Sequence, residues 1–138
     1  MSDLGRIDHI AIAVEDLEAS IAMYKSVFGV ETCDREYVAE FEVDIATFTV
    51  DGTDVELLEG KTENCAIRRF VRERGQGLHH IAFVVDDLPA TLERLKTRGV
   101  RLIDEVPRRG KANTLVAFVH PKSTHGVLYE LVQTDRAG

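Results

Sequence analysis

The chain has 138 residues, of which 44% are hydrophobic and 30% charged, which fits one domain, 5–138, with a core of its own. Its formal net charge of −7 repels phosphate backbones and anionic lipid, so we expect neither a nucleic-acid nor a membrane partner. Two cysteines outside a CxxC pair indicate reduced thiols, and no apolar run reaches the ~20 residues of a membrane span, so the predicted location is the cytoplasm.

The chain contains an internal repeat. HIAIAVEDLEA, which starts at His9, matches HIAFVVDDLPA, which starts at His80, with seven identities in eleven positions. The match continues where VELL, from Val55, aligns with YELV, from Tyr129. We therefore predict two copies of one module, module one over 5–60 and module two over 78–133.

Module one is predicted to contain, in chain order, a strand over 7–14, a helix between Asp16 and Gly29, and strands near 32–37, over 40–50 and over 53–59. Asp16 is the expected N-cap, and Gly29 supplies the left-handed residue at the helix end. The apolar face of the helix recurs with the helical period at Leu17, Ile21, Tyr24 and Phe28. Asp51-Gly52 predicts a two-residue hairpin turn.

A linking helix is predicted over 63–75, with its regular part at 66–74 and Gly75 at its end. Module two repeats the first, with a strand from His80, a helix between Asp87 and Gly99, and strands over 101–105, 115–120 and 127–132. Each module is thus βαβββ. Because a small sheet with one helix leaves a face uncovered, the modules should pair edge to edge. The predicted fold class is α+β, an eight-stranded cup of two pseudo-symmetric modules.

Ligand-type residues stand at matching places in both modules. His9 and His80 occupy the same position of the first strand, while Glu56 and Glu130 lie in the last strand among apolar neighbours, 47 and 50 residues further on. A buried carboxylate without a partner is costly. We therefore predict that the four side chains converge on one metal site inside the cup. The alternatives are a satisfied core role for the histidines and water-facing edge positions for the glutamates.

The type of metal follows from the ligand set. Two imidazoles and two carboxylates leave two positions of an octahedron open for water or substrate oxygens. This set suits Co(II), the first choice, or Mn(II), Ni(II) or Fe(II), with Zn(II) also possible, rather than a closed structural zinc site.

Several segments of the chain resemble the methylmalonyl-CoA epimerase family of the vicinal oxygen chelate (glyoxalase) superfamily. They include IDHIAIAVEDLEASIAMY, GLHHIAFVVDDL and FVHPKSTHGVLYELVQ, and together they span most of the chain. The resemblance implies a metal-dependent isomerase that interconverts (R)- and (S)-methylmalonyl-CoA through a metal-stabilised enolate. It also implies an acyl-CoA thioester substrate and a homodimer in propionate metabolism. The sequence does not decide between methylmalonyl and a close relative such as ethylmalonyl as the acyl group.

The resemblance also implies residue roles. One catalytic base is the last ligand glutamate, Glu130. The second comes from a strand of module one, where gapless placement gives Asp44, with Glu42 or a water molecule as alternatives. Strand alternation places Asp44 on the polar face, which we expect to line the cup. Lys122, Ser123 and Gly126 are expected to hold the substrate's carboxylate or thioester end.

Two other functional classes remain in view. The first is another metalloenzyme on the same scaffold, either a glyoxalase I-like lactoylglutathione lyase or an extradiol dioxygenase. A dioxygenase would need only His9, His80 and Glu130, which leaves Glu56 unexplained. The second is a non-catalytic antibiotic-binding protein, a class that tends to have lost the metal ligands.

Overall fold

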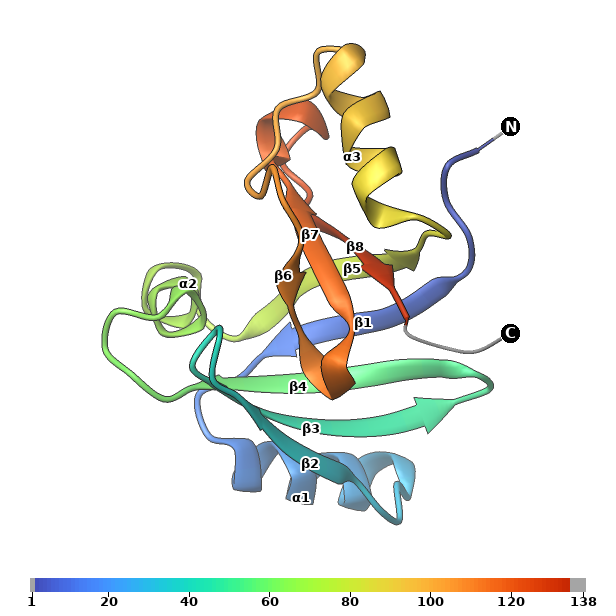
Figure 1. The fold of residues 1–138 in the computed structure, drawn as a ribbon. Coiled ribbons are helices and arrows are strands. Elements are labelled where there is room, and N and C mark those ends of the chain that lie inside the picture. Colours follow the sequence, from blue (N-terminus) through green and yellow to red (C-terminus); the bar gives the residue numbers. More distant parts are fainter. Residues whose placement is uncertain (1, 135–138) are drawn as a thin grey trace. The chain divides into compact units, whose positions relative to one another are not determined.

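The computed structural model describes residues 2–134, so residues 135–138 of the predicted domain lie outside the described part. Its helices and strands occur in two successive βαβββ modules joined by a helix (Figure 1). Their bounds are β1 Ile7–Ala13, α1 Leu17–Phe28, β2 Asp34–Val38, β3 Val43–Val50, β4 Thr53–Gly60, α2 Ala66–Arg74, β5 Gly77–Val84, α3 Leu88–Thr97, β6 Arg108–Arg109, β7 Leu115–Val119 and β8 Tyr129–Gln133.

The strand order is β2-β3-β4-β1-β5-β8-β7-β6. Both modules follow one plan, because β1 is parallel to β4 and β5 is parallel to β8, while the other pairs within each module are antiparallel. The predicted α+β class with two βαβββ modules and eight strands is confirmed. No helix among the described residues is long and apolar enough to cross a bilayer.

The chain divides into two compact units, one of His9–His79 and one of the residues from His80 onward with those that precede His9. The N-terminal residues join the second unit because the Gly5 N–H donates to the Val84 carbonyl at 2.7 Å. Asp3 also accepts hydrogen bonds from Arg94 of α3 and from Arg98, the residue that follows this helix. Module one was predicted to start at residue 5, whereas the corresponding compact unit starts at His9. A single domain over 5–138 stays a prediction.

Helices cover both faces of the sheet in the His9–His79 unit. Leu17 and Ile21 of α1 pack against Ala46 and Leu57 on one face, and Figure 1 shows α1 lying along β2 and β3. On the other face, Ile67 of α2 packs in a cluster with Ala11, Ala13, Ile45 and Leu58. The predicted inward position of Phe28 is wrong, because 71% of its surface is exposed at the helix end.

The helix caps repeat between the modules. Asp16 accepts from the Ala19 N–H and Asp87 from the Ala90 N–H, each at 3.0 Å, as predicted. A second pair of contacts was not predicted. The N–H of Leu17 donates to Glu59 of β4 at 2.8 Å, and the N–H of Leu88 donates to Gln133 of β8 at 2.7 Å. The first residue of each helix is thus tied to the last strand of its own module.

Two predicted strands differ from those in the structure. Residues 40–42 form a turn, with Glu42 at φ +56°, so β3 starts at Val43. The predicted strand over 101–105 is reduced to one bridge, between Leu102 and Val119, and the second strand of module two is the short β6. The buried carboxylate of Asp104 accepts from the Phe118 N–H at 2.9 Å, and this contact replaces regular strand pairing there.

Candidate metal centre and active site

A buried histidine–glutamate pair lies in the His9–His79 unit. His9 is on β1 and Glu56 on the parallel neighbour β4, where Ala11 is the register partner of Glu56. The His9 Nδ1 and Glu56 Oε2 atoms are 3.5 Å apart, and each side chain is 7% exposed. The pair therefore sits away from water, on the face of β4 that also carries Leu58 and the α2 contact.

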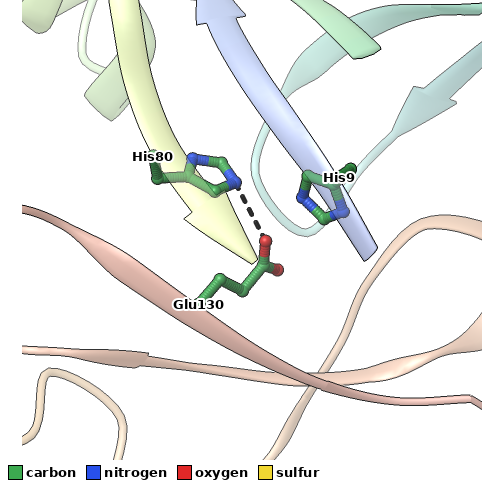
Figure 2. A group of neighbouring side chains, drawn as sticks. All are labelled: His9, His80 and Glu130. Carbon is green, nitrogen blue, oxygen red and sulfur yellow. Dashed lines mark ion pairs between the residues drawn. The ribbon is translucent and has the colours of Figure 1, made fainter. Parts of the chain in front are cut away.

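A second pair lies at the matching place of the other unit. His80 is on β5 and Glu130 on β8, with Ala82 as the register partner of Glu130. The His80 Nε2 and Glu130 Oε1 atoms are 2.9 Å apart, and the side chains are 5% and 8% exposed (Figure 2). The ring of Phe118 meets the imidazole of His80 edge-on, with centroids 5.1 Å apart.

The strand order tests the alternative that the two glutamates lie at water-facing edge positions. β4 lies between β3 and β1, and β8 lies between β5 and β7, so neither glutamate is on an edge strand. The water-facing interpretation of Glu56 and Glu130 is therefore wrong. The buried carboxylate contact of each imidazole is compatible both with a satisfied core role for the histidines and with metal ligation.

The donor set fits a divalent cation. Glu56 and Glu130 are buried acids, and imidazole and carboxylate together suit borderline and hard ions. Within residues 2–134, His9 of one unit and His80 and Glu130 of the other are candidate metal ligands, and Figure 2 labels all three. A polar atom beside Glu56 also lacks a partner: the buried Oγ1 of Thr47 has no hydrogen bond within the described chain. That all four predicted ligands share one ion stays a prediction.

Asp44 does not lie on the face that carries Glu56. The pairing of β3 with β4 places Thr47 opposite Glu56 and Asp44 opposite Glu59, and successive residues of a strand point to opposite faces. Asp44 therefore shares the α1-covered face, where its carboxylate lies 3.7 Å from the Lys61 Nζ. This register contradicts the prediction of Asp44 as a second base beside the Glu56 ligand.

Glu42, the alternative second base, lies in the turn before β3. Its carboxylate accepts a hydrogen bond from the Thr62 hydroxyl at 3.1 Å, and its backbone carbonyl accepts from the Lys61 N–H at 2.9 Å. The side chain is exposed. The fold thus ties this turn to the segment after β4.

The predicted substrate-binding turn is held by its own hydrogen bonds. The Ser123 hydroxyl bonds to the backbone of Arg101, and the Gly126 N–H donates to the Pro121 carbonyl at 2.8 Å. The Nδ1 of His120 accepts from the Lys122 N–H at 3.0 Å, and partial desolvation, with Arg101 and Lys122 nearby, lowers the pKa of His120. Lys122 itself is exposed, so Ser123 and Gly126 shape the turn that presents it.

Comparison with known proteins identifies the family. A sequence profile described as Glyoxalase/Bleomycin resistance protein/Dioxygenase superfamily matches residues 8–118. An ethylmalonyl-CoA/methylmalonyl-CoA epimerase of Cereibacter sphaeroides is 36% identical over 132 residues, which cover 94% of this chain and 98% of the relative. The chain belongs to the methylmalonyl-CoA epimerase family of this superfamily.

Solved structures of epimerases agree with this assignment. Methylmalonyl-CoA epimerase from Mycobacterium tuberculosis is 35% identical, with a TM-score of 0.92 over 99% of this chain and 92% of that chain. A variant of the Streptomyces coelicolor epimerase in complex with 2-nitronate-propionyl-CoA is 38% identical, with a TM-score of 0.88 over 97% of each chain. The predicted family, fold and epimerase class are confirmed, and the lyase, dioxygenase and antibiotic-binding alternatives are not favoured.

Two residues of this epimerase site were missed from the sequence. Thr47 and Phe118 are the antiparallel register partners of Glu56 and Glu130, so they occupy equivalent places in the two modules. The shift of 71 residues that aligns His9 with His80 also places Thr47 on Phe118, so alignment of the modules through their first strands would have paired the two positions. One of these residues carries a hydroxyl and the other an aromatic ring. That two such different side chains lie opposite the two glutamates follows only from the strand pairing.

Proposed function

We propose that this epimerase interconverts (R)- and (S)-methylmalonyl-CoA at a single divalent metal centre held by His9, Glu56, His80 and Glu130. The observation that carries the proposal is the pair of buried histidine–glutamate contacts, 3.5 Å and 2.9 Å, at matching places of a duplicated module. Two buried carboxylates call for cationic charge. The duplication supplies two equivalent half-sites for one ion.

The cation that we propose is Co(II), with Mn(II), Ni(II), Fe(II) and Zn(II) as alternatives. When bound, such an ion would supply Lewis-acid stabilisation of the negative charge that develops on the substrate oxygens as the α-proton leaves. Metal analysis of the protein purified from its own host, without added metal, would identify the ion.

Glu130 is the residue that we propose takes and returns the proton on one face of the substrate. Its buried carboxylate can accept a proton, and the contact of Oε1 with His80 Nε2 at 2.9 Å fixes its orientation. Phe118 packs edge-on against His80 and restrains the imidazole in turn. The supporting contacts are all within one unit, so the base is held by its own module.

Inversion at the α-carbon needs a second proton position on the opposite face, because one base returning its own proton restores the same hand. With Asp44 on the other side of the sheet, the alternatives are Glu42 and a water molecule. Glu42→Gln would distinguish them. A loss of deuterium exchange for one substrate hand only would assign Glu42, and equal exchange of both hands would assign water.

The substrate is proposed to be an acyl-CoA thioester. Lys122 is the residue that we propose contacts its carboxylate or thioester end, presented by the turn that Ser123 and Gly126 stabilise. We also propose a cytoplasmic homodimer that serves propionate metabolism. Sedimentation of the metal-loaded protein would give the oligomeric state, and rates with methylmalonyl-CoA and ethylmalonyl-CoA would give the acyl preference.

Deuterium entry tests the proposed function. The metal-loaded protein is incubated with methylmalonyl-CoA in heavy water, and loss of the α-proton signal is followed by NMR. We expect rapid exchange that stops when a chelator removes the ion. Exchange no faster than the uncatalysed background, with the ion fully bound, would overturn the proposal.

A further inference from the structure

Thr47 of β3 carries a buried hydroxyl that the fold does not use. The residue is 4% exposed, and its Oγ1 has no hydrogen-bond partner among the described residues. A buried donor without a hydrogen-bond partner destabilises the folded state. Valine has the same shape and no such cost, so a threonine here points to a partner that arrives when the site is filled.

The position of Thr47 identifies that partner. Thr47 is the antiparallel register partner of Glu56, and the neighbour of Glu56 on the other side is Ala11 of β1. Side chains directly opposite one another in an antiparallel pair have Cβ atoms about 5 Å apart. Since Ala11 carries no polar group, Thr47 is the hydrogen-bonding side chain in register with Glu56.

The equivalent place in the other module shows a different solution. Phe118 is the register partner of Glu130, its ring packs on His80, and the histidine–glutamate contact there is 2.9 Å. In the first unit an alcohol replaces the ring, and the contact between His9 and Glu56 is 3.5 Å. The Glu130 pair is therefore restrained by aromatic packing, whereas the hydroxyl of Thr47 is available to restrain Glu56.

We propose that Thr47 is a positioning residue for Glu56 in the metal-loaded protein, in which its hydroxyl donates a hydrogen bond to the carboxylate oxygen that does not ligate the ion. This inference rests on the proposed function through the ligand role of Glu56. Ligating carboxylates are generally hydrogen-bonded themselves, and loss of such a partner weakens metal binding about 10–100-fold. A hydroxyl supplies the single donor that this role requires.

The test is the Co(II) affinity, measured by competition with a chromophoric chelator, of the full chain and its variants. We expect Thr47→Val to weaken binding by about 10–100-fold and to change the Co(II) absorption spectrum. Thr47→Ser should restore both. Thr49→Val is the matched control, because Thr49 is on the same strand and face but is exposed, and its hydroxyl already donates to the Asp54 carboxylate at 2.7 Å. That variant should bind Co(II) like the unaltered chain.

A second measurement separates positioning from a merely structural role. Without metal, Thr47→Val removes an unsatisfied hydroxyl, so the melting temperature of the metal-free protein should rise or stay the same while its Co(II) affinity falls. A lower melting temperature of the metal-free variant would show that the hydroxyl has a structural partner, and would overturn the inference.

Glu56→Ala distinguishes the inference from the proposed function. If this variant loses Co(II) affinity but Thr47→Val does not, the positioning role is overturned and the metal site stands. If neither variant loses affinity, Glu56 is not a ligand, and both the four-ligand site and the role of Thr47 are overturned. Loss of affinity in both variants, with rescue by Thr47→Ser, is the result that we expect.

Discussion

The two modules hold the same pair of side chains in different ways. In both, a histidine of the first strand contacts a glutamate of the last strand, and the residue beside the glutamate in the parallel register is an alanine. The pair of the second unit is short and backed by the ring of Phe118. The pair of the first unit is longer and lies beside Thr47, whose hydroxyl has no hydrogen bond to the part of the chain that the structure describes.

This difference suggests a division of work after duplication. A residue that moves a proton needs a restrained position, which aromatic packing around His80 provides for Glu130. A residue that only ligates needs a donor to orient it once the ion is present, which a hydroxyl can provide. One module would thus carry the base and the other would complete the metal site.

Replacing Glu130 or Glu56 by glutamine is expected to give the largest change in the rate of deuterium entry or in metal affinity. At saturating metal, Glu130→Gln should lower the rate of deuterium entry into methylmalonyl-CoA by about 10²–10⁴-fold, because a general base is lost. Glu56→Gln should act mainly on metal affinity and leave the saturated rate within about tenfold. Equal losses of the saturated rate in both variants would remove the proposed division of work.

Comparing the protein with and without metal tests whether the two histidine–glutamate pairs bind an ion in the folded chain. An ion that binds the folded chain stabilises it by about 2.7 kcal/mol at a concentration of 100 times its dissociation constant. We expect the melting temperature to rise with added Co(II), and we expect Glu56→Ala and Glu130→Ala each to reduce this rise. A melting temperature that ignores Co(II) would argue against a metal site in either module.

The two modules are most alike at their helix N-caps, where they can be compared directly. Asp16 and Asp87 make the same 3.0 Å hydrogen bond, so Asp16→Ala and Asp87→Ala should each lower the free energy of unfolding by about 1 kcal/mol. Urea denaturation of the two variants measures this. If the losses in free energy of unfolding of the two variants differ by much more than about 1 kcal/mol, one module limits the stability of the chain.

Asp44→Asn is expected to have almost no catalytic effect. Because the register places Asp44 on the α1-covered face, exchange of both substrate hands should stay within about twofold of the unaltered enzyme. Separate assays of the (R) and (S) substrates check this. Selective loss of one hand would restore Asp44 as the second base and contradict the strand register.

The smallest effect concerns pH and the N-terminal segment of the second unit. Hydrogen bonds from Arg98 and then Arg94 hold the pKa of Asp3 below its ordinary 3.8. Since the folded pKa is the lower one, this stabilisation is present above pH 3.8 and is lost as the pH falls through the folded pKa. The melting-temperature difference between the unaltered chain and Asp3→Asn should therefore be small at neutral pH and disappear in acid. A difference that grows in acid would contradict the sign.

Local features of the fold could be predicted from the sequence, and non-local ones could not. The caps at Asp16 and Asp87, the turn at Asp51-Gly52 and the helix Ala66–Arg74 depend on neighbouring residues, and all were predicted correctly. The strand predicted over 101–105 failed because the carboxylate of Asp104 bonds to the backbone of Phe118, fourteen residues away. A contact of that range leaves no local signal.

The site divides in the same way. Apolar neighbours together with the repeat indicated the burial of the four proposed ligands, because equal residues at equal places of two modules share an environment. The face of Asp44 could not be obtained by alternation along its own strand. Alternation gives only two sets of residues, and the pairing of Thr47 with Glu56 decides which set shares a face with the ligand.

Counting metal ions tests the central claim most directly. Titration of the metal-free chain with Co(II), with bound ion measured by elemental analysis and coordinated imidazoles counted by pulsed electron paramagnetic resonance, separates one shared centre from two independent pairs. We predict saturation at one ion per chain with two coordinated imidazoles. Two ions per chain with one imidazole each, or no bound ion, would contradict a single centre built from both modules.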